Sequence, residues 1–388
     1  MLATGAGYLR VALLAGAYAV SGCGGEPSSS APGAAALGSV RQPFINGQDD
    51  RREYYELTDD RDRTLMEQSI VALVPDVAAR PLARGNLGEL PTWGDLNHLC
   101  PDQAFVDQPS AAFCSGVLVD WDLVLTSGHC VNIFPLRNLR VVFNYFFRDP
   151  GELALTRGDV YTVDDVVLAR DDQNEAQERI DYGWLRLSEP VRPPHVPTAV
   201  RTRMPELALG DGIVAINAGG GVPFKFDSGG RVRDLRAGSD DYFVADTDTS
   251  EGSSGGPAFN EDFALVGTLA RGAPDFIQTS SGCAASDRED NPRFAREQFT
   301  YVARSVEGLC EVDPERWLCD ASCEDGCEPP PSPNVITEAA GGCALSELRP
   351  LGRRWPARGQ SVAWGALLLA ATLRRRAVAR RAAATAAT

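Results

Sequence analysis

Between about Ile45 and Leu309 the sequence alternates short apolar runs with turns rich in Gly, Pro and Asp. Many short β-like runs in succession favour a barrel or a sandwich. A short helix is expected after Val302, and the polar stretches 75–112 and 271–296 are predicted to be surface loops. The predicted strands are Ser69–Val74, Phe113–Val119, Leu123–Thr126, Leu139–Phe143, Val160–Leu168, Tyr182–Leu187, Gly212–Asn217, Tyr242–Ala245, Ala264–Ala270 and Gln298–Val302.

Residues 1–22 have the pattern of an export signal, with a positive charge before the apolar run Val11–Val20. The run ends in Val-Ser-Gly-Cys, which resembles a bacterial lipobox and implies that Cys23 becomes the lipidated first residue of the mature protein. An ordinary cleaved signal with an incidental cysteine is the alternative. Residues 23–44 would then form a flexible tether or a propeptide.

Residues 344–388 contain a second apolar segment, Ser361–Leu373, followed by an Arg cluster. They resemble C-terminal sorting signals of some Gram-negative bacteria, which combine a cysteine, an apolar helix and an Arg cluster. Cys343 could supply the cysteine, and a disordered Arg- and Ala-rich tail is the alternative. The two ends together predict a protein that is secreted or held in a bacterial envelope, at the membrane through its lipid, its C-terminal segment or both.

Charge and cysteine content narrow the possible partners and cofactors. Residues 1–347 carry a formal charge of −25, since 28 basic residues stand against 53 acidic ones, and such an acidic body repels nucleic acid. An even number of cysteines, 10, in an exported chain predicts disulfides rather than a metal site. Residues 310–343 are interpreted as a Cys- and Pro-rich tail pinned by disulfides.

The most specific motif is the segment Gly252–Pro257, which reads Gly-Ser-Ser-Gly-Gly-Pro between two β-like runs. A serine that attacks an acyl group must expose its hydroxyl while backbone N–H groups point at the developing oxyanion. Glycines permit the unusual loop that this arrangement requires. The segment therefore predicts Ser254 as a nucleophile, with the N–H groups of Gly252 and Ser254 as the oxyanion hole. A plain Ser/Gly turn is the alternative.

A serine nucleophile needs a general base, and the chain offers only 3 histidines. His98 lies in a loop-like stretch and His195 follows two prolines, so both are predicted to be surface residues. His129 ends a strand and a tight turn, which a disulfide between Cys114 and Cys130 could clamp with about 3 kcal/mol. His129 is therefore the predicted base.

The third role is a carboxylate that orients the imidazole and offsets its charge. Asp181 directly precedes an alternating strand and is the predicted residue. Asp164 and Asp165 are competitors inside another β-like run, where they are interpreted as solvent-facing charges.

These motifs follow one another in the order His, Asp, Ser and resemble the chymotrypsin-fold serine proteases over roughly residues 65–309. The resemblance implies an all-β domain, residues 45–309, made of two packed six-stranded antiparallel barrels with a short C-terminal helix. The catalytic cleft would lie between the barrels. The stretch Ile45–Arg52, with Asp248 before the nucleophile loop, is similar to the bacterial glutamyl-endopeptidase-like branch.

Three positions depart from the family pattern. Gly128 stands where the family usually has Ala. Ser253 replaces the Asp that animal members pair with a new N-terminus on activation, so that switch is expected to be missing. Ser250 replaces a cysteine at the pocket rim, which leaves Cys283 to find another partner.

By the same resemblance, Asp248 falls at the base of the primary specificity pocket, where trypsin-like enzymes receive Arg or Lys. Glu297 could add a second acid, whereas Arg271 could neutralise Asp248. Leu269 stands where the glutamyl branch uses a His, so a basic residue is expected before the scissile bond. The predicted pocket residues besides Asp248 are Thr249, Leu269, Arg271 and Gly272.

The sequence therefore predicts a serine endopeptidase that acts on proteins or peptides and needs no metal or organic cofactor. The main alternative is a catalytically silent relative that binds peptides or serves as an envelope scaffold, and esterase chemistry by the same triad is a weaker one. Silent relatives usually lose a member of the triad. This chain keeps all three, which favours the enzyme.

Overall fold

The computed structural model describes residues 45–172, 179–204, 207–272, 275–289, 291, 295–320 and 329–333. The export signal, Cys23, Cys343 and the apolar C-terminal segment lie outside these residues, and the anchoring and envelope location inferred from them stay predictions. In the described ranges, no helix is both long and apolar enough to cross a membrane.

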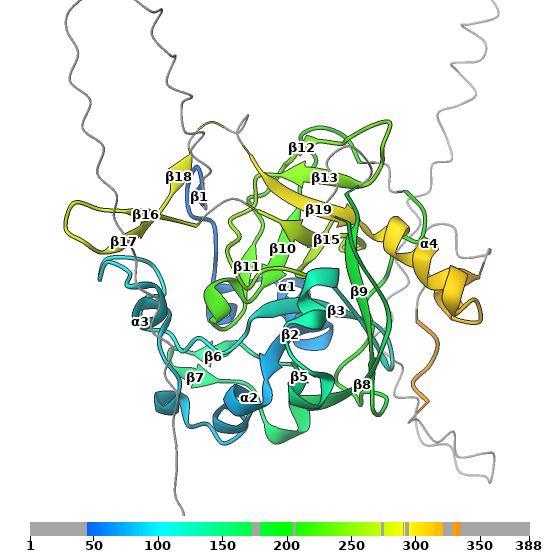
Figure 1. The fold of residues 1–388 in the computed structure, drawn as a ribbon, viewed down its shortest axis with the longest axis horizontal. Helices are drawn as coiled ribbons and strands as arrows, with labels where there is room; N and C mark the ends of the chain where they lie inside the picture. Colours follow the sequence, from blue (N-terminus) through cyan, green and yellow to red (C-terminus); the bar gives the residue numbers. More distant parts are fainter. Residues whose placement is uncertain are drawn as a thin grey trace, which may run out of the picture. The chain divides into compact units, whose positions relative to one another are not determined.

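The first β-unit is a closed six-stranded antiparallel barrel (Figure 1). Val71 and Leu73 belong to one buried apolar cluster together with Leu118, whereas their neighbours Ile70 and Ala72 belong to another. Because both faces of such strands are buried, the sequence there is a continuous apolar run. Around the barrel the strands are β2 (Ile70–Pro75), β3 (Cys114–Asp120), β4 (Leu123–Thr126), β9 (Asp181–Leu187), β8 (Val160–Asp171) and β5 (Leu139–Val142).

The second β-unit is a seven-stranded sheet that stays open, which differs from the predicted second six-stranded barrel. Phe243 and Phe299 stack in its core with ring centres 5.3 Å apart. At one edge the Asp227 carboxylate, at the end of β11, accepts the N–H groups of Gly229 (2.8 Å) and Asp248 (2.7 Å). In order, the strands are β11 (Lys225–Asp227), β10 (Val214–Asn217), β14 (Pro257–Phe259), β15 (Leu265–Arg271), β19 (Glu297–Tyr301), β13 (Tyr242–Ala245) and β12 (Val232–Asp234).

Helices are few, but they are not confined to the position predicted from the sequence. Helix α4 (Val302–Val312) is the expected one, whereas α1 (Asp60–Gln68), α2 (Asp76–Leu82) and α3 (Trp93–Asn97) were not predicted. The Asp59 side chain caps α1 by accepting the Arg61 N–H. Short 3-10 turns are η1 (Tyr54–Glu56), η2 (Leu87–Glu89), η3 (Gly128–Asn132), η4 (Leu136–Asn138), η5 (Arg157–Asp159), η6 (Gly219–Gly221) and η8 (Trp317–Cys319).

Residues Ile45–Arg52 form an extended segment, here called the N-terminal strap, that joins distant parts of the domain. Its first residues, β1 (Ile45–Asn46), pair in parallel with β18 (Arg288–Glu289), and Arg52 bridges to Phe226 of β11. Three disulfides join cysteines of the described residues, and the one of longest range links Cys283 to Cys100. The other two disulfides are Cys114–Cys130 and Cys310–Cys319. Two small hairpins complete the fold, β6 (Phe147–Asp149) with β7 (Glu152–Leu153) and β16 (Phe276–Gln278) with β17 (Ala284–Ser286).

Candidate active site

The loop that carries Ser254 is held from both β-units. The Ser254 carbonyl accepts the Ser115 N–H of β3 at 2.7 Å, and the Gly255 N–H donates to the Leu269 carbonyl of β15 at 2.7 Å. Gly252 and Gly255 have φ angles of 95° and 79°, in the left-handed region that favours glycine. A Cβ on Gly255 would also lie 2.3 Å from the Ser115 carbonyl oxygen. The glycines of the motif are therefore required by the conformation of the loop.

Ser253, which stands where animal relatives carry Asp, is fully buried and ties the loop to β10. Its hydroxyl donates to Asn217 Oδ1 at 2.7 Å and accepts the Ser250 N–H at 3.0 Å. The same Asn217 oxygen accepts the Gly219 N–H at 3.1 Å. This network of neutral side chains holds the loop from within.

Two backbone donors beside the predicted nucleophile are left without partners. Within the described residues, neither the Gly252 N–H nor the Ser254 N–H has a hydrogen-bond acceptor. Backbone N–H groups in folded proteins are nearly always paired, so two free donors in one short loop are unusual. The Ser115 hydroxyl meanwhile donates to the Gly252 carbonyl at 2.9 Å and steadies the loop. These donors are the ones that the sequence predicted for an oxyanion hole.

Asp181 and His129 form a close and oriented pair. Asp181, the first residue of β9, is fully buried, and its Oδ2 lies 2.8 Å from His129 Nδ1. Its Oδ1 accepts the N–H groups of Gly128 (2.6 Å) and His129 (3.2 Å). The carboxylate thereby favours the tautomer with the proton on Nδ1 and leaves Nε2 as the basic nitrogen. The competitors Asp164 and Asp165 are exposed on β8.

The disulfide Cys114–Cys130 lies close to both His129 and Ser254. Its two sulfurs and a ring nitrogen of His129 lie within 4.8 Å of one another, and Cys130 Sγ lies 3.8 Å from the Ser254 carbonyl oxygen. Among the described residues, no hydrogen bond joins the Ser254 hydroxyl to His129. In unliganded enzymes such bonds are often long and tighten when substrate binds. Both sulfurs are oxidised, so they offer no thiolate to a metal.

The protonation of His129 depends on charges from three strands. Burial of the ring lowers its pKa, but the hydrogen bond and the negative charge of Asp181 outweigh this and raise the pKa above its ordinary value. Asp171, at the end of β8, raises the pKa further, whereas Arg271, at the end of β15, lowers it. The net effect is a more basic imidazole, as a residue that takes a proton from a hydroxyl requires.

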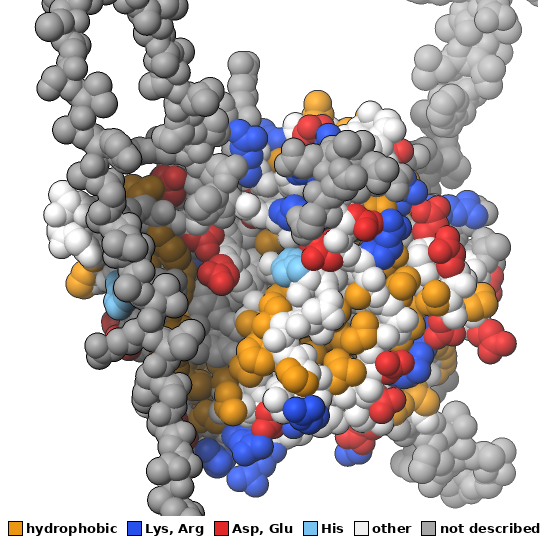
Figure 2. All heavy atoms as spheres, in the orientation of Figure 1, with side chains coloured by type: hydrophobic (Ala, Val, Ile, Leu, Met, Phe, Trp, Pro, Cys, Tyr) orange, Lys and Arg blue, Asp and Glu red, His pale blue; other side chains and the backbone are white. Residues whose placement is uncertain are grey.

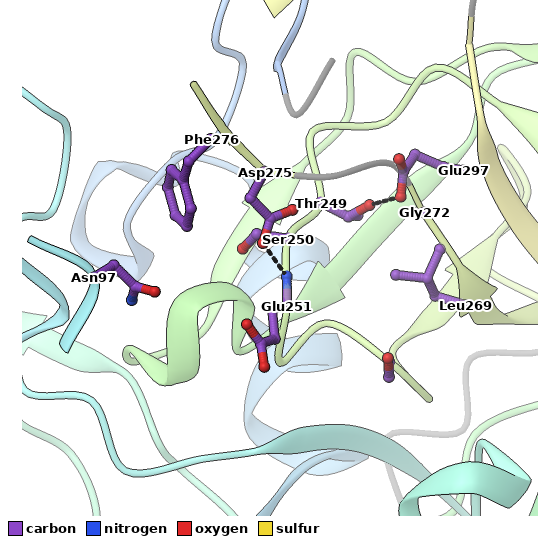
Figure 3. Close-up of a pocket in the computed structure, with 10 residues that line it drawn as sticks. Asn97, Thr249, Ser250, Glu251, Leu269, Gly272, Asp275, Phe276 and Glu297 are labelled. Atoms are coloured by element: carbon purple, nitrogen blue, oxygen red, sulfur yellow. Dashed lines mark hydrogen bonds between the residues drawn. The ribbon is translucent and has the colours of Figure 1, made fainter. Parts of the chain in front are cut away.

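A cavity of about 310 Å³ opens beside Ser254 and has an acidic lining (Figure 3). Glu251 comes from the nucleophile loop, Asp275 precedes β16, and Glu297 begins β19. Glu297 is almost fully buried and accepts a hydrogen bond from the Thr249 hydroxyl, whereas the Asp275 carboxylate accepts the Glu251 N–H at 2.8 Å. The remaining lining residues are Asn97, Ser250, Leu269, Gly272 and Phe276.

The predicted pocket residues divide into two groups. Thr249, Leu269 and Gly272 line the cavity, but Asp248 and Arg271 do not. The Asp248 carboxylate instead accepts the N–H groups of Asn46 (2.8 Å) and Asp50 (2.9 Å) in the N-terminal strap. The Arg271 guanidinium turns toward Asp171 and Asp181 rather than Asp248.

Sequence reasoning missed the cavity residues that come from the inserted segments, and it misplaced one histidine. Asn97 and Phe276 reach the cavity because the disulfide Cys100–Cys283 joins α3 to the β16–β17 hairpin. No local signal marks such a long-range contact.

His195, predicted to lie on the surface, is only 2% exposed. It pairs with Asp159 (2.8 Å) and stacks on Phe143, so its buried partners override the loop-like context.

Comparisons with known proteins gave a family match and a solved structure of limited similarity. No curated protein matches the chain. Among solved structures, the VesB protease of Vibrio cholerae is 13% identical with a TM-score of 0.41, over 69% of this chain and 66% of that one, just under two thirds of its length. Residues 114–267, which include His129, Asp181 and Ser254, match the trypsin-like peptidase domain. This match supports a serine protease domain of the chymotrypsin fold in that segment of the chain.

Proposed function

We propose that this protein is a serine endopeptidase that hydrolyses proteins or peptides through Ser254, His129 and Asp181. The observation that carries the proposal is the buried Asp181 bonded to His129 Nδ1 at 2.8 Å, beside a glycine-rich serine loop whose Gly252 and Ser254 N–H groups have no acceptor among the described residues. The family match over the same residues supports it.

In the proposed reaction, Ser254 Oγ attacks the peptide carbonyl carbon while His129 Nε2 takes the hydroxyl proton. The carbonyl oxygen becomes an oxyanion held by the N–H groups of Gly252 and Ser254. The tetrahedral intermediate collapses, the C–N bond breaks, and the amine leaves with the proton from His129. Water then attacks the acyl-enzyme with His129 as base, which releases the carboxylic acid and restores Ser254.

A fluorophosphonate probe on the full-length protein tests this activity against a catalytically silent role. The probe should label the wild type, and Ser254→Ala should lose the label because the nucleophilic oxygen is gone. Ser281→Ala, in the exposed turn of the β16–β17 hairpin, is the matched control and should label like the wild type. A folded wild type that takes no label, or label that survives Ser254→Ala, would favour the scaffold alternative.

For specificity we propose a preference for Arg or Lys before the scissile bond, with Glu297 as the selecting anion. Glu297 lines the cavity with its carboxylate bonded to Thr249, and Glu251 and Asp275 add acidic groups nearby. Figure 2 shows acidic side chains near the middle of the face of the molecule that it draws. A cationic side chain would therefore find a favourable potential in the cavity, whereas a carboxylate would be repelled.

Peptide substrates that differ only at the residue before the scissile bond test this preference. The wild type should cleave the Arg and Lys peptides best, and Glu297→Gln should lower kcat/KM for them by at least about tenfold, because a buried charge partner is lost. Asp248→Asn, a buried acid outside the cavity, is the matched control and should keep the preference. A wild type that favours Glu, or a preference that Asp248→Asn abolishes and Glu297→Gln spares, contradicts the assignment.

A further inference from the structure

Arg271 places a cation beside the carboxylate that orients His129. Its Nη2 lies 4.0 Å from Asp181 Oδ2 and 3.9 Å from Asp171 Oδ1, and it donates to the Asp172 carbonyl at 3.1 Å. The Asp181 oxygen that it approaches is the one that accepts His129 Nδ1. Arg271 is not among the residues that line the cavity, so these contacts point to the triad rather than to the substrate side chain.

The surroundings of this guanidinium make its charge effective. The Arg271 side chain is only 18% exposed, and the Asp181 side chain is fully buried. Within the described residues, the buried Nη1 of Arg271 has no hydrogen-bond partner. Charges that are shielded from water and salt in this way interact more strongly than charges at an open surface. The position of Arg271 is therefore suited to act on Asp181 and, through it, on His129.

We propose that Arg271 is a positioning residue that, with Asp171 opposing it, sets the pH range in which His129 is a neutral base. The inference rests on the proposed function. A fixed cation disfavours a second positive charge on the imidazole and balances part of the Asp181 charge, whereas the Asp171 carboxylate favours the imidazolium. Among the described residues, the charged groups that act on His129 are Asp181 on β9, Asp171 on β8 and Arg271 on β15. The adjoining cystine does not titrate.

This balance has a direct consequence for activity at low pH. Asp181 must be an anion to orient the imidazole, but the same charge raises the pKa of His129 and leaves less of the free base. Arg271 offsets part of that effect without breaking the Asp181–His129 hydrogen bond. The enzyme would therefore keep more of its activity as the pH falls below neutrality than a triad without the cation.

Two single substitutions with opposite expected effects test the proposal. In the pH profile of kcat/KM, Arg271→Gln should move the acidic limb upward by about 0.3–1 pH unit, and Asp171→Asn should move it downward by a similar amount. Arg271→Lys, which keeps the charge, should stay near the wild type, and the double variant should return toward it. The proposal would be overturned if both substitutions moved the acidic limb in the same direction. It would also be overturned if they lowered the maximum of kcat/KM and left the acidic limb where it is in the wild type.

A second measurement separates this inference from the proposed function. The chain has only 3 histidines, so the imidazole resonance of His129 can be assigned with a His129→Gln variant and titrated by NMR. The His129 pKa should rise in Arg271→Gln and fall in Asp171→Asn, even in a Ser254→Ala background without catalysis. Unchanged titration in both variants would refute the role of Arg271, whereas failure of the fluorophosphonate label alone would refute only the enzyme activity.

Discussion

At the residue scale, the tightest steric constraint beside the site falls on Gly128, which directly precedes His129. A Cβ at this position would lie 1.9 Å from the Arg170 carbonyl oxygen and 2.8 Å from that of Tyr182. Both are backbone atoms of the paired strands β8 and β9, so they cannot move aside as a flexible side chain would. An alanine has no room here, because the two strands pass close to the histidine turn.

Gly128→Ala is expected to destabilise the protein by at least about 1–3 kcal/mol, since the new methyl group must push two backbone segments apart. Activity on peptides should fall further than stability alone explains, because the shift also displaces His129 and the Asp181 contacts. Thermal unfolding and kcat/KM measure the two effects. Gly88→Ala, where a Cβ meets nothing within 4 Å, is the control. A Gly128→Ala protein with wild-type unfolding and activity would contradict the steric argument.

Residue-level prediction is strongest where the proposed chemistry itself demands a residue type. Ser254, His129 and Asp181 could each be proposed because acyl transfer needs a nucleophile, a base and an orienting carboxylate, and the structure pairs His129 with Asp181. Asp248 was assigned to the pocket by resemblance alone, whereas its carboxylate binds two N–H groups of the N-terminal strap. Asp275 had no sequence signal, since its place in the cavity depends on the path of an inserted segment.

At the element scale, strands with a strong local pattern could be predicted from the sequence. Each of the predicted strands overlaps an observed one, and Leu123–Thr126 and Tyr242–Ala245 agree at both ends. Their apolar residues are buried on one or both faces, so the pattern reflects the packing. Among the missed strands, β1 and β18 are two residues long and pair with each other across more than 200 positions. Local composition carries no information about such pairs.

Helix α1 was missed for a different reason. Its sequence is mainly charged and polar, and Met66 is its only fully buried residue, so no apolar stripe marks it. The cap at Asp59 supplies the local signal that was available. The two predicted surface loops contain α3 and the β16–β17 hairpin, and the Cys100–Cys283 disulfide links the two segments. Both then contribute residues to the cavity.

At the scale of the whole molecule, the N-terminal strap is anchored on a pair of buried acids. Asp248 accepts two strap N–H groups, and its own N–H donates to Asp227 at 2.7 Å. Burial, with the charge of Asp227 adding to it, raises the pKa of Asp248 to about 8, and burial raises that of Asp227 to about 6. The strap, the open sheet and the segment before the nucleophile loop therefore share one titrating site.

The sign of the resulting pH effect follows from linkage. An acid whose pKa is higher in the folded than in the unfolded protein makes its full contribution to stability when the pH is below its pKa in the unfolded protein. This contribution is lost as the pH rises to its pKa in the folded protein. For Asp248 the loss should extend from about pH 4 to about pH 8.

Between pH 6 and pH 8, the Tm of Asp248→Asn should therefore fall less than the Tm of the wild type, because the amide does not titrate. The exposed Asp102→Asn should follow the wild type. The two proteins are compared by the change of Tm with pH rather than by the Tm itself, since the amide also replaces one of the oxygens that bind the strap. An equally steep fall in Asp248→Asn would mean that the strap is not held by a titrating carboxyl.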